Sequence, residues 1–347
     1  MMSCEGHIRG LIQEKTFITI AEFMMIALYH PEFGYYMTRQ PLGADADFIT
    51  APEASAMFGE IICFWAIERY HRLYRPQKIA LVELGPGRGA LMTDFLRTAR
   101  LLPDFFNALD IHLVEISPKM QEVQRHVISC PEICWHSDAE EAMQAIKGLP
   151  ALMIANEFFD ALPVRQFQKT LAGWAERGVV LSQDDRLTFE CKSIDENDIP
   201  FPPARPNDIF EYRPAAQRIL ENMIRHLSRD SGAALIVDYG YLDGYGDTLQ
   251  AVSGQRCVPV LQNPGAVDIT AHVDFKALQN IAGEKSTLTT QAEFLIRHGI
   301  VKLVQAHTRK ASEAQKDQLA LEFHKLISSQ EMGILFKVLE IEKRHHD

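Results

Sequence analysis

The chain has 347 residues, of which 47% are hydrophobic and 23% are charged, as is ordinary for a soluble globular protein. Its formal net charge of −11 argues against a protein that binds nucleic acid by neutralising phosphates. No apolar run approaches the roughly 18 residues of a membrane span, and residues 1–20 resemble neither a signal peptide nor a transit peptide. We therefore expect a cytoplasmic protein without membrane insertion or nucleic-acid partners, whose six cysteines are reduced thiols.

The N-terminal part of the chain predicts helices and one loop. Residues 5–30 carry apolar side chains at helical spacing, with Thr19 as a candidate N-cap. Residues 41–53 predict a loop that ends where a new helix begins, and Pro52 and Glu53 suit the first turn of that helix. The apolar stripe that follows is expected to pack in the core.

The most informative stretch begins with an apolar run over residues 79–82. Glu83 follows it, and then Gly85, Gly87 and Gly89 alternate with other residues before a helix-like segment. The pattern predicts a buried strand that turns sharply into a helix. Glycine is required where the backbone turns tightly or approaches a ligand closely, because a Cβ would collide there. We interpret the stretch as the first strand-to-helix turn of a nucleotide-binding α/β sheet, whose ligands bind at the carboxyl ends of the strands.

Glu83 bears on which ligand this turn binds. Gly85, Gly87 and Ala90 also satisfy the looser dinucleotide pattern G-x-G-x-x-A, so the glycines are compatible with NAD. A carboxylate at the strand end, two residues before the first glycine, is poorly placed beside a pyrophosphate. It suits the ammonium group of S-adenosylmethionine (SAM), which also carries a sulfonium. The residues favour SAM over NAD and over a turn without such a ligand, and all three interpretations remain open at this point.

The next two predicted strands supply further candidates for the same ligand. Residues 111–115 form the second strand, and its acid, Glu115, lies 26 residues after the last glycine of the turn, near the roughly 20 expected for a ribose-binding carboxylate. The alternative for this acid is a solvated charge at a strand end. A helix over 117–127 and a short strand over 133–136 follow. The loop after that strand, with Asp138, lies where an adenine could be contacted.

The fourth predicted strand ends in polar residues. An apolar run over residues 151–155 leads to Asn156, Glu157 and Asp160, which are interleaved with aromatic side chains. In a doubly wound sheet, this strand end faces the reactive end of the ligand.

The rest of the chain changes its pattern. Residues 164–191 predict short antiparallel strands, and the acidic, Pro-rich residues 193–214 predict an irregular connection. We expect this insertion, residues 164–214, to face the substrate. The pattern then predicts a helix over 215–229, a fifth strand over 233–240, a loop-rich segment, helices near 275–281, 291–298 and 312–328, and a last strand over 334–341.

Together these motifs resemble the MidA-like class I SAM-dependent methyltransferases, in order from about residue 10 to residue 341. The runs 157–163 and 47–53 are far more specific than the glycine turn. Ala46 departs from the family, which usually has Gly-Asp-Phe here, and the family's Gly-Pro before the first helix is absent near Thr16. The resemblance rests on residues 30–36 (HPEFGYY), 47–53 (DFITAPE), 58–60 (FGE), 82–89 (VELGPGRG), 112–115 (HLVE), 156–164 (NEFFDALPV), 174–177 (WAER), 238–240 (DYG) and 268–275 (DITAHVDF).

The resemblance implies a class I SAM-methyltransferase fold, which is an α/β fold with a Rossmann-like doubly wound sheet, an N-terminal helical extension and a β-rich insertion. The implied extension, with a loop that covers the cofactor, is residues 1–75, and the core is 76–347 with 164–214 as the insertion. The expected cofactor is SAM, and its product is S-adenosylhomocysteine. We expect it to be bound by Glu83, Gly85, Pro86, Gly87, Gly89, Glu115, Ile116, Asp138, Asn156, Phe48, Thr50 and Pro52.

The resemblance also bears on the reaction. Methyl transfer from SAM is an in-line displacement, so the protein mainly aligns the nucleophile and excludes water. A guanidinium nucleophile is protonated at neutral pH, and carboxylates can orient it and accept its proton. Glu157 and Asp160 are the candidates, with His272 as a third possible base; the alternatives are helix capping for the acids and a structural role for the histidine. No metal is expected, although Asp268, His272 and Asp274 have the spacing of a metal triad.

The leading hypothesis is a SAM-dependent methyltransferase that acts on a protein arginine. In the mitochondrial members of the family, which are complex I assembly factors, the substrate is a subunit of respiratory complex I. The alternative is a SAM-binding assembly chaperone with little or no catalytic role. A NAD-dependent oxidoreductase is the third hypothesis. The oligomeric state is open.

Overall fold

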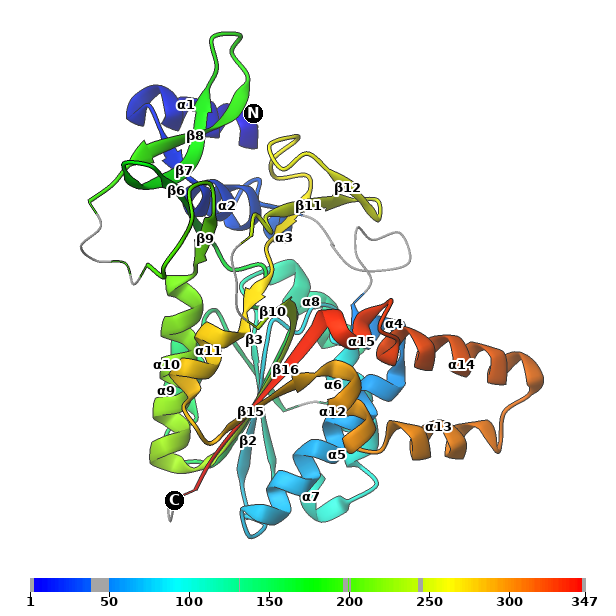
Figure 1. Ribbon diagram of the computed structural model, residues 1–347. Coiled ribbons are helices and arrows are strands. Elements are labelled where there is room, and N and C mark those ends of the chain that lie inside the picture. The colour runs from blue at the N-terminus through cyan, green and yellow to red at the C-terminus, as the bar shows by residue number, and fades with distance from the viewer. Residues whose placement is uncertain are drawn as a thin grey trace. The chain divides into compact units, whose positions relative to one another are not determined.

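The computed structural model describes residues 3–38, 50–130, 132–195, 199, 201–242 and 246–344 (Figure 1). The chain divides into two compact units, and each unit combines segments that are distant in the sequence. The first unit comprises Met1–Phe48, Asp160–Gln217 and Asp243–Asp274. The second comprises Ile49–Phe159, Arg218–Leu242 and Phe275–Asp347.

These unit limits differ from the predicted domain limits at residues 75 and 76. The second unit begins at Ile49 because α5 (Ala56–Arg72) packs against α6 (Ala90–Ala99). The approach is close enough that a Cβ at Gly59 would lie 2.8 Å from the Cβ of Asp94. Residues of the predicted N-terminal extension therefore belong to the packing around the glycine turn.

The second unit is built on a mixed sheet that is parallel in its centre. Its strands follow the order β15-β16-β10-β5-β2-β3-β4. Strands β4, β3, β2, β5 and β10 pair in parallel, whereas β16 pairs antiparallel with both β10 and β15. Their bounds are β2 Ile79–Leu84, β3 Leu109–Val114, β4 Ile133–His136, β5 Ala151–Asn156, β10 Gly232–Tyr241, β15 Ser286–Thr290 and β16 Phe336–Lys343.

Helices cover both faces of this sheet, with α9, α10 and α11 on one side and α5 and α6 on the other (Figure 1). Every residue of β2 and β5 is buried, as expected for parallel strands covered on both faces. The predicted doubly wound α/β sheet is therefore confirmed. The other helices of this unit are α4 Ala51–Ala54, α7 Pro103–Ala108, α8 Pro118–Val127, α9 Ala139–Ala145, α10 Pro214–Asp230, α11 Phe275–Ala282, α12 Gln291–Arg297, α13 Ile300–Thr308, α14 Glu313–Ile327 and α15 Met332–Leu335.

The first unit carries the predicted antiparallel strands. They form a sheet in the order β1-β7-β6-β9, with β8 paired to β7, and a smaller sheet in the order β12-β11-β13. Strand β9 lies inside the stretch 193–214 that was predicted to be irregular. The bounds are β1 Ile18–Thr19, β6 Arg165–Thr170, β7 Gly173–Leu181, β8 Leu187–Ser193, β9 Ile209–Tyr212, β11 Gln250–Ser253, β12 Arg256–Val258, β13 Asp268–Thr270 and β14 Val273–Asp274.

The helices of the first unit refine one prediction. Residues 5–30, predicted to be helical with Thr19 as an N-cap, form two helices, α1 (Cys4–Lys15) and α2 (Ile20–Tyr29). The chain breaks at Thr16, whose φ of 66° is left-handed. Thr19 is the N-cap of α2, as predicted, and forms a capping box with Glu22. A short helix, α3 (Tyr35–Thr38), follows.

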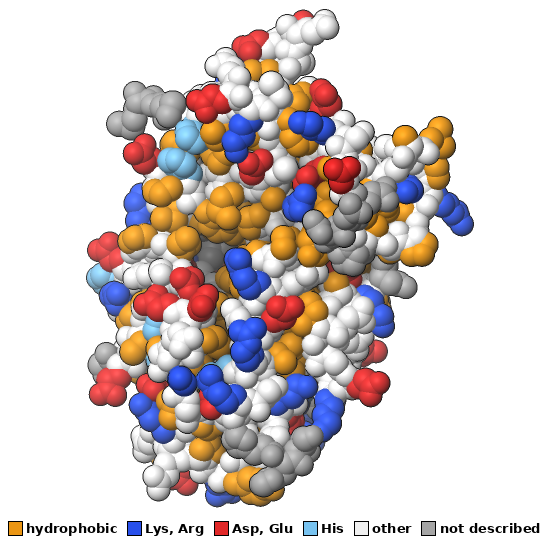
Figure 2. All heavy atoms as spheres, turned by 90° about the vertical axis from the view of Figure 1, so that its left-hand side faces the viewer, with side chains coloured by type: hydrophobic (Ala, Val, Ile, Leu, Met, Phe, Trp, Pro, Cys, Tyr) orange, Lys and Arg blue, Asp and Glu red, His pale blue; other side chains and the backbone are white. Residues whose placement is uncertain are grey.

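Two features of the described residues bear on membrane insertion and on the distribution of charge. None of the described helices is both long and apolar enough to cross a membrane. On the face drawn in Figure 2, Lys and Arg side chains lie among acidic and apolar ones.

Candidate functional site

Several predicted ligand-binding residues meet at one edge of the second unit's sheet. Leu84, at the end of β2, pairs with Val114 at the end of β3 and with Ala155 near the end of β5. Because these strands are parallel, their carboxyl ends lie side by side. Glu83 and Asn156 lie at this edge, and the residue that follows β3 is Glu115.

The glycine turn has the backbone geometry that the sequence predicted. Gly85, Gly87 and Gly89 all have positive φ, at 64°, 53° and 85°, a region that side chains with a Cβ rarely occupy. A Cβ at Gly85 would lie 2.8 Å from Cδ2 of Phe158. The N–H of Gly89 donates to the carbonyl of Pro86 at 2.8 Å, and Gly89 is the N-cap of α6. The turn is thus closed and tightly packed.

Glu83 is a buried carboxyl group without a cation of its own among the described residues. Its side chain is 3% exposed, and burial raises its pKa to about 8. In the described part of the chain, its Oε2 atom has no hydrogen-bond partner. A buried carboxylate is costly unless a positive or hydrogen-bonding group faces it. A ligand ammonium at this position would supply that group, so the site fits the amino end of SAM.

Glu115 is tied to both the second strand and the glycine turn. Its Oε1 accepts from the N–H of Ser117 at 2.8 Å, and its Oε2 accepts from Nε2 of Gln124 at 3.1 Å. Burial raises the pKa of Glu115 to about 7, although these hydrogen bonds oppose the shift. Nε2 of Gln124 also donates to the carbonyl of Gly87 at 2.7 Å.

Gln124 was missed by the sequence reasoning. It is fully buried on α8 and joins the ribose-binding candidate to the glycine turn. The sequence did hold one indication of its role: Gln124 is a polar residue four positions after Met120, on the apolar face of an amphipathic helix.

For the remaining cofactor-binding candidates, the structure shows no contact that points to a ligand. Asp138 is the N-cap of α9 and accepts from the N–H of Glu141 at 2.9 Å, so its carboxylate already has a structural partner. Ile116 is exposed next to Glu115. Thr50 and Pro52 lie at the N-terminus of α4, whereas Phe48 lies outside the described residues. The roles of these residues in cofactor binding stay predictions.

Glu157 follows β5 in a strained turn. It is not a glycine, yet its φ is 50°, and such conformations are typical of functional sites. Its Oε1 accepts from the N–H of Ala51, at the start of α4, at 3.0 Å and from Nδ2 of Asn156 at 3.2 Å. The carboxylate therefore contacts a helix start that is distant in the sequence, and capping and catalysis are compatible for this residue.

Asp160 and His272 belong to the first unit, where one arginine joins their segments. The Arg213 guanidinium donates to the carbonyls of Asp160, Leu162, Ala271 and His272 at 2.5–3.4 Å. The N–H of Ala271 also donates to the carbonyl of Asp160 at 3.1 Å. Arg213 was not predicted, because nothing near it in the sequence marks it.

The spacing of Asp268, His272 and Asp274 does not make a metal site. Among the described residues, no group of three or more His, Cys, Asp or Glu side chains is arranged to hold a metal ion.

Comparison with known proteins decides the family. Residues 61–293 match the model of a protein family described as S-adenosyl-L-methionine-dependent methyltransferase. The chain belongs to this family of SAM-dependent methyltransferases. The match includes Glu83, the glycine turn, Glu115 and Glu157, so the methyltransferase hypothesis and SAM as its cofactor are confirmed.

Relatives along almost the whole chain agree with this family. The chain is 33% identical over 376 residues to "Protein arginine methyltransferase NDUFAF7, mitochondrial" of Xenopus tropicalis, covering 97% of this chain and 85% of the relative. It is 34% identical over 359 residues to the protein of the same name from Mus musculus, covering 95% and 82%. The resemblance to a family of arginine-methylating proteins is confirmed.

A solved structure of a superfamily member confirms the methyltransferase fold. This protein, from Burkholderia thailandensis, was crystallised bound to S-adenosyl-homocysteine. It superposes with a TM-score of 0.82 at 25% sequence identity, over 99% of this chain and 92% of that one.

The comparison also corrects one expectation. We expected a cytoplasmic protein, but the similar proteins from Xenopus tropicalis and Mus musculus are both named as mitochondrial. The cytoplasmic assignment is therefore wrong. It rested on the composition of residues 1–20, and the composition of a folded segment does not specify a compartment.

Proposed function

We propose that this methyltransferase transfers a methyl group to an arginine side chain of a protein. The observation that carries the proposal is the Glu157 carboxylate, held at the strand edge that also bears Glu83 and Glu115. The name of the relatives as protein arginine methyltransferases supports the choice of arginine. By family resemblance, the proposed protein substrate is a subunit of respiratory complex I.

The residues at this edge suit the different parts of SAM. In the proposal, Glu83 binds the ammonium group and Glu115 the ribose hydroxyls, while the glycine turn allows close approach of the backbone. Ile116 and Asp138 are assigned to the adenine end, and Asn156, Thr50, Pro52 and Phe48 to the remaining contacts. When bound, SAM supplies an electrophilic methyl group; the chain supplies binding, alignment and exclusion of water.

Glu157 is proposed to act on the guanidinium. A carboxylate that accepts hydrogen bonds from two guanidinium nitrogens fixes the plane of the group. It also takes up the proton that the nitrogen loses as its bond to the methyl carbon forms. Asp160 is proposed as a second acceptor for the substrate, and His272 as a base on the substrate side.

The test combines a labelled cofactor with a substitution. Lysate from a strain that lacks the protein is incubated with the purified protein and tritiated-methyl SAM, and labelled proteins are identified by mass spectrometry. We expect methylarginine in one or a few proteins with the wild type. Glu157→Gln should bind S-adenosylhomocysteine normally in calorimetry but transfer about 100-fold less label.

Matched controls make the test specific. Glu122→Gln makes the same chemical change at an exposed position on α8 and should transfer like the wild type. Label on a residue other than arginine would reject the proposed substrate class. Full rescue of the deletion strain by the Glu157→Gln protein would favour the assembly-chaperone alternative instead.

A further inference from the structure

The motif Asp238-Tyr239-Gly240 lies in the last part of β10 and has so far received no role. Its acid is completely buried, with 0% exposure. The residue before it, Val237, pairs with Asn156 at the end of β5 in parallel register. Asp238 is therefore the first residue of β10 that has no strand partner left on β5, at the level where the chain turns through Glu157.

Strand β10 holds both ends of this turn. The N–H of Glu157 donates to the carbonyl of Val237 at 2.9 Å. The N–H of Phe159 donates to Oδ2 of Asp238 at 3.0 Å, while the other carboxylate oxygen of Asp238, Oδ1, accepts from the N–H of Tyr239 at 2.9 Å. Backbone and side chain of neighbouring β10 residues thus fix the amides on either side of Phe158.

The turn needs such support. A non-glycine residue with a φ of 50° is strained and persists only where its surroundings enforce that conformation. Both side chains of the turn have close neighbours at the ligand edge. The Glu157 carboxylate accepts from the N–H of Ala51, and the Phe158 ring fills the space that a Cβ at Gly85 would occupy.

We propose that Asp238 is a positioning residue for methyl transfer, which sets the orientation of Glu157 by binding the N–H of Phe159. The inference rests on the proposed role of Glu157. A carboxylate suits the position because both of its oxygens accept hydrogen bonds from backbone N–H groups. An asparagine of the same size offers one acceptor, and its NH₂ group would face an N–H donor.

Asp238→Asn is therefore the informative substitution. In the lysate assay, we expect its rate of transfer at saturating SAM to fall about 100-fold, since small misplacements of reacting groups have effects of that order. The Kd for S-adenosylhomocysteine should change by less than about threefold, because a factor of three is only about 0.7 kcal/mol. Hydrogen exchange at the Phe159 amide should become faster.

Two comparisons separate positioning from general destabilisation. Leu227→Ala removes a fully buried side chain on α10, and such a change destabilises the fold without touching the turn. Measured well below its unfolding temperature, this variant should keep the wild-type rate. In the Glu157→Gln background, adding Asp238→Asn should lower the rate by less than about twofold, as residues that act as a unit are not additive.

The outcomes discriminate between the two proposals. If Glu157→Gln lowers transfer about 100-fold and Asp238→Asn lowers it by the same factor in both backgrounds, the positioning role is rejected and the function of Glu157 stands. A wild-type rate for Asp238→Asn, or equal losses in Asp238→Asn and Leu227→Ala, also rejects it. If Glu157→Gln transfers at the wild-type rate, the role of Glu157 fails, and the positioning role fails with it.

Discussion

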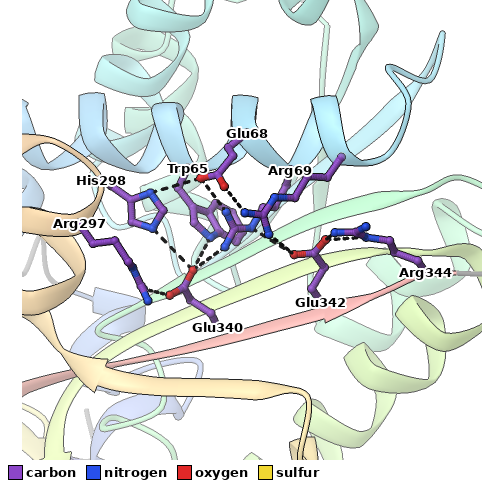
Figure 3. A network of polar contacts seen from close by, with 9 residues as sticks. Trp65, Glu68, Arg69, Arg297, His298, Glu340, Glu342 and Arg344 are labelled. Atoms are coloured by element: carbon purple, nitrogen blue, oxygen red, sulfur yellow. Dashed lines mark hydrogen bonds and ion pairs between the residues drawn. The ribbon is translucent and has the colours of Figure 1, made fainter. Parts of the chain in front are cut away.

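Two glutamates on the sheet of the second unit differ sharply in their surroundings. Glu83 on β2 and Glu340 on β16 are both buried, at 3% and 6% exposure. Glu340 accepts from Nε1 of Trp65 at 3.0 Å and from Nη2 of Arg69 at 2.7 Å, and it also pairs with Arg297 (Figure 3). Glu83 has no comparable partners among the described residues.

The partners reverse the effect of burial on the pKa. Burial raises the pKa of Glu340, but the His298 imidazole, whose Nε2 lies 3.7 Å from Oε2, and the charges of Arg297 and Arg69 outweigh it, so this pKa lies below the ordinary value. Burial alone acts on Glu83 and raises its pKa to about 8. Glu340 has its own cations within the fold, whereas Glu83 has none among the described residues and is proposed to bind a cation that comes with the ligand.

The largest expected effect is on stability, from Glu340→Gln. The substitution removes the carboxylate that the buried Arg69 shares with the exposed Arg297, and breaking a buried ion pair costs about 3–5 kcal/mol. Because the pKa of Glu340 is lowered on folding, its contribution is fully present at pH 7, above the unfolded value of about 4.3, and is lost as pH falls through the folded value. Urea unfolding at pH 7 measures the change.

Binding of S-adenosylhomocysteine by the Glu340→Gln protein should stay within about twofold of the wild type, which is about 0.4 kcal/mol. If stability is unchanged and binding is lost, Glu340 belongs with the ligand-binding acids and the contrast with Glu83 fails.

The second effect is on affinity, from Glu83→Gln. Losing a buried charge-assisted contact should raise the Kd for S-adenosylhomocysteine about 100-fold, or about 2.7 kcal/mol, as calorimetry would show. The stability of the ligand-free protein should not fall. The pKa of Glu83 is raised in the folded state, so folding is favoured by the protonated form, and this contribution is lost as pH rises from the unfolded pKa of about 4.3 towards the folded value of about 8.

The glutamine of the Glu83→Gln variant has no proton to lose, so this variant should lose less stability than the wild type between pH 6 and 8. Tight binding by Glu83→Gln would show that another group receives the ammonium.

The smallest effect is a pH dependence of binding by the wild type. The ligand ammonium favours ionised Glu83, so between pH 6 and 7 the affinity should rise by up to about tenfold, since one pKa unit corresponds to 1.36 kcal/mol. The rise should level off above about pH 8, where Glu83 is ionised in the free protein as well.

Calorimetry with S-adenosylhomocysteine from pH 6 to 9 measures this profile. Glu83→Gln should flatten the rise in affinity with pH, whereas Glu115→Gln should retain most of it. The comparison separates Glu83 from Glu115, whose pKa is also raised by burial. A flat wild-type profile would mean that Glu83 is already ionised in the free protein.

The cofactor side of the site was predictable because its signals are local. Alternating glycines after an apolar strand mark a tight turn, and Glu83 and Glu115 are recognisable as acids at strand ends. The supporting residues are different in kind. Gln124 reaches Gly87, 37 positions away, Asp238 reaches Phe159 across 79 positions, and no local pattern announces either contact.

The same reasoning explains the errors. Residues 5–30 have helical spacing, and Thr19 was a predicted N-cap, but the left-handed Thr16 that ends α1 was not predicted. Strand β15 and helix α13 were not predicted. The Pro-rich stretch 193–214 contains β9, which pairs antiparallel with β6. No pattern within the stretch itself predicts this pairing.

The sequence by itself determined where most strands of the central sheet lie along the chain, the glycine turn and the presence of acids at the strand ends, because backbone preference and hydrophobic period act over a few residues. Only the tertiary structure decided which acids have cations. Trp65 and Arg69 meet Glu340 across 275 and 271 positions, and Glu83 meets no such group among the described residues. Charge neutralisation depends on distance in space, and that distance is set by how the whole chain packs.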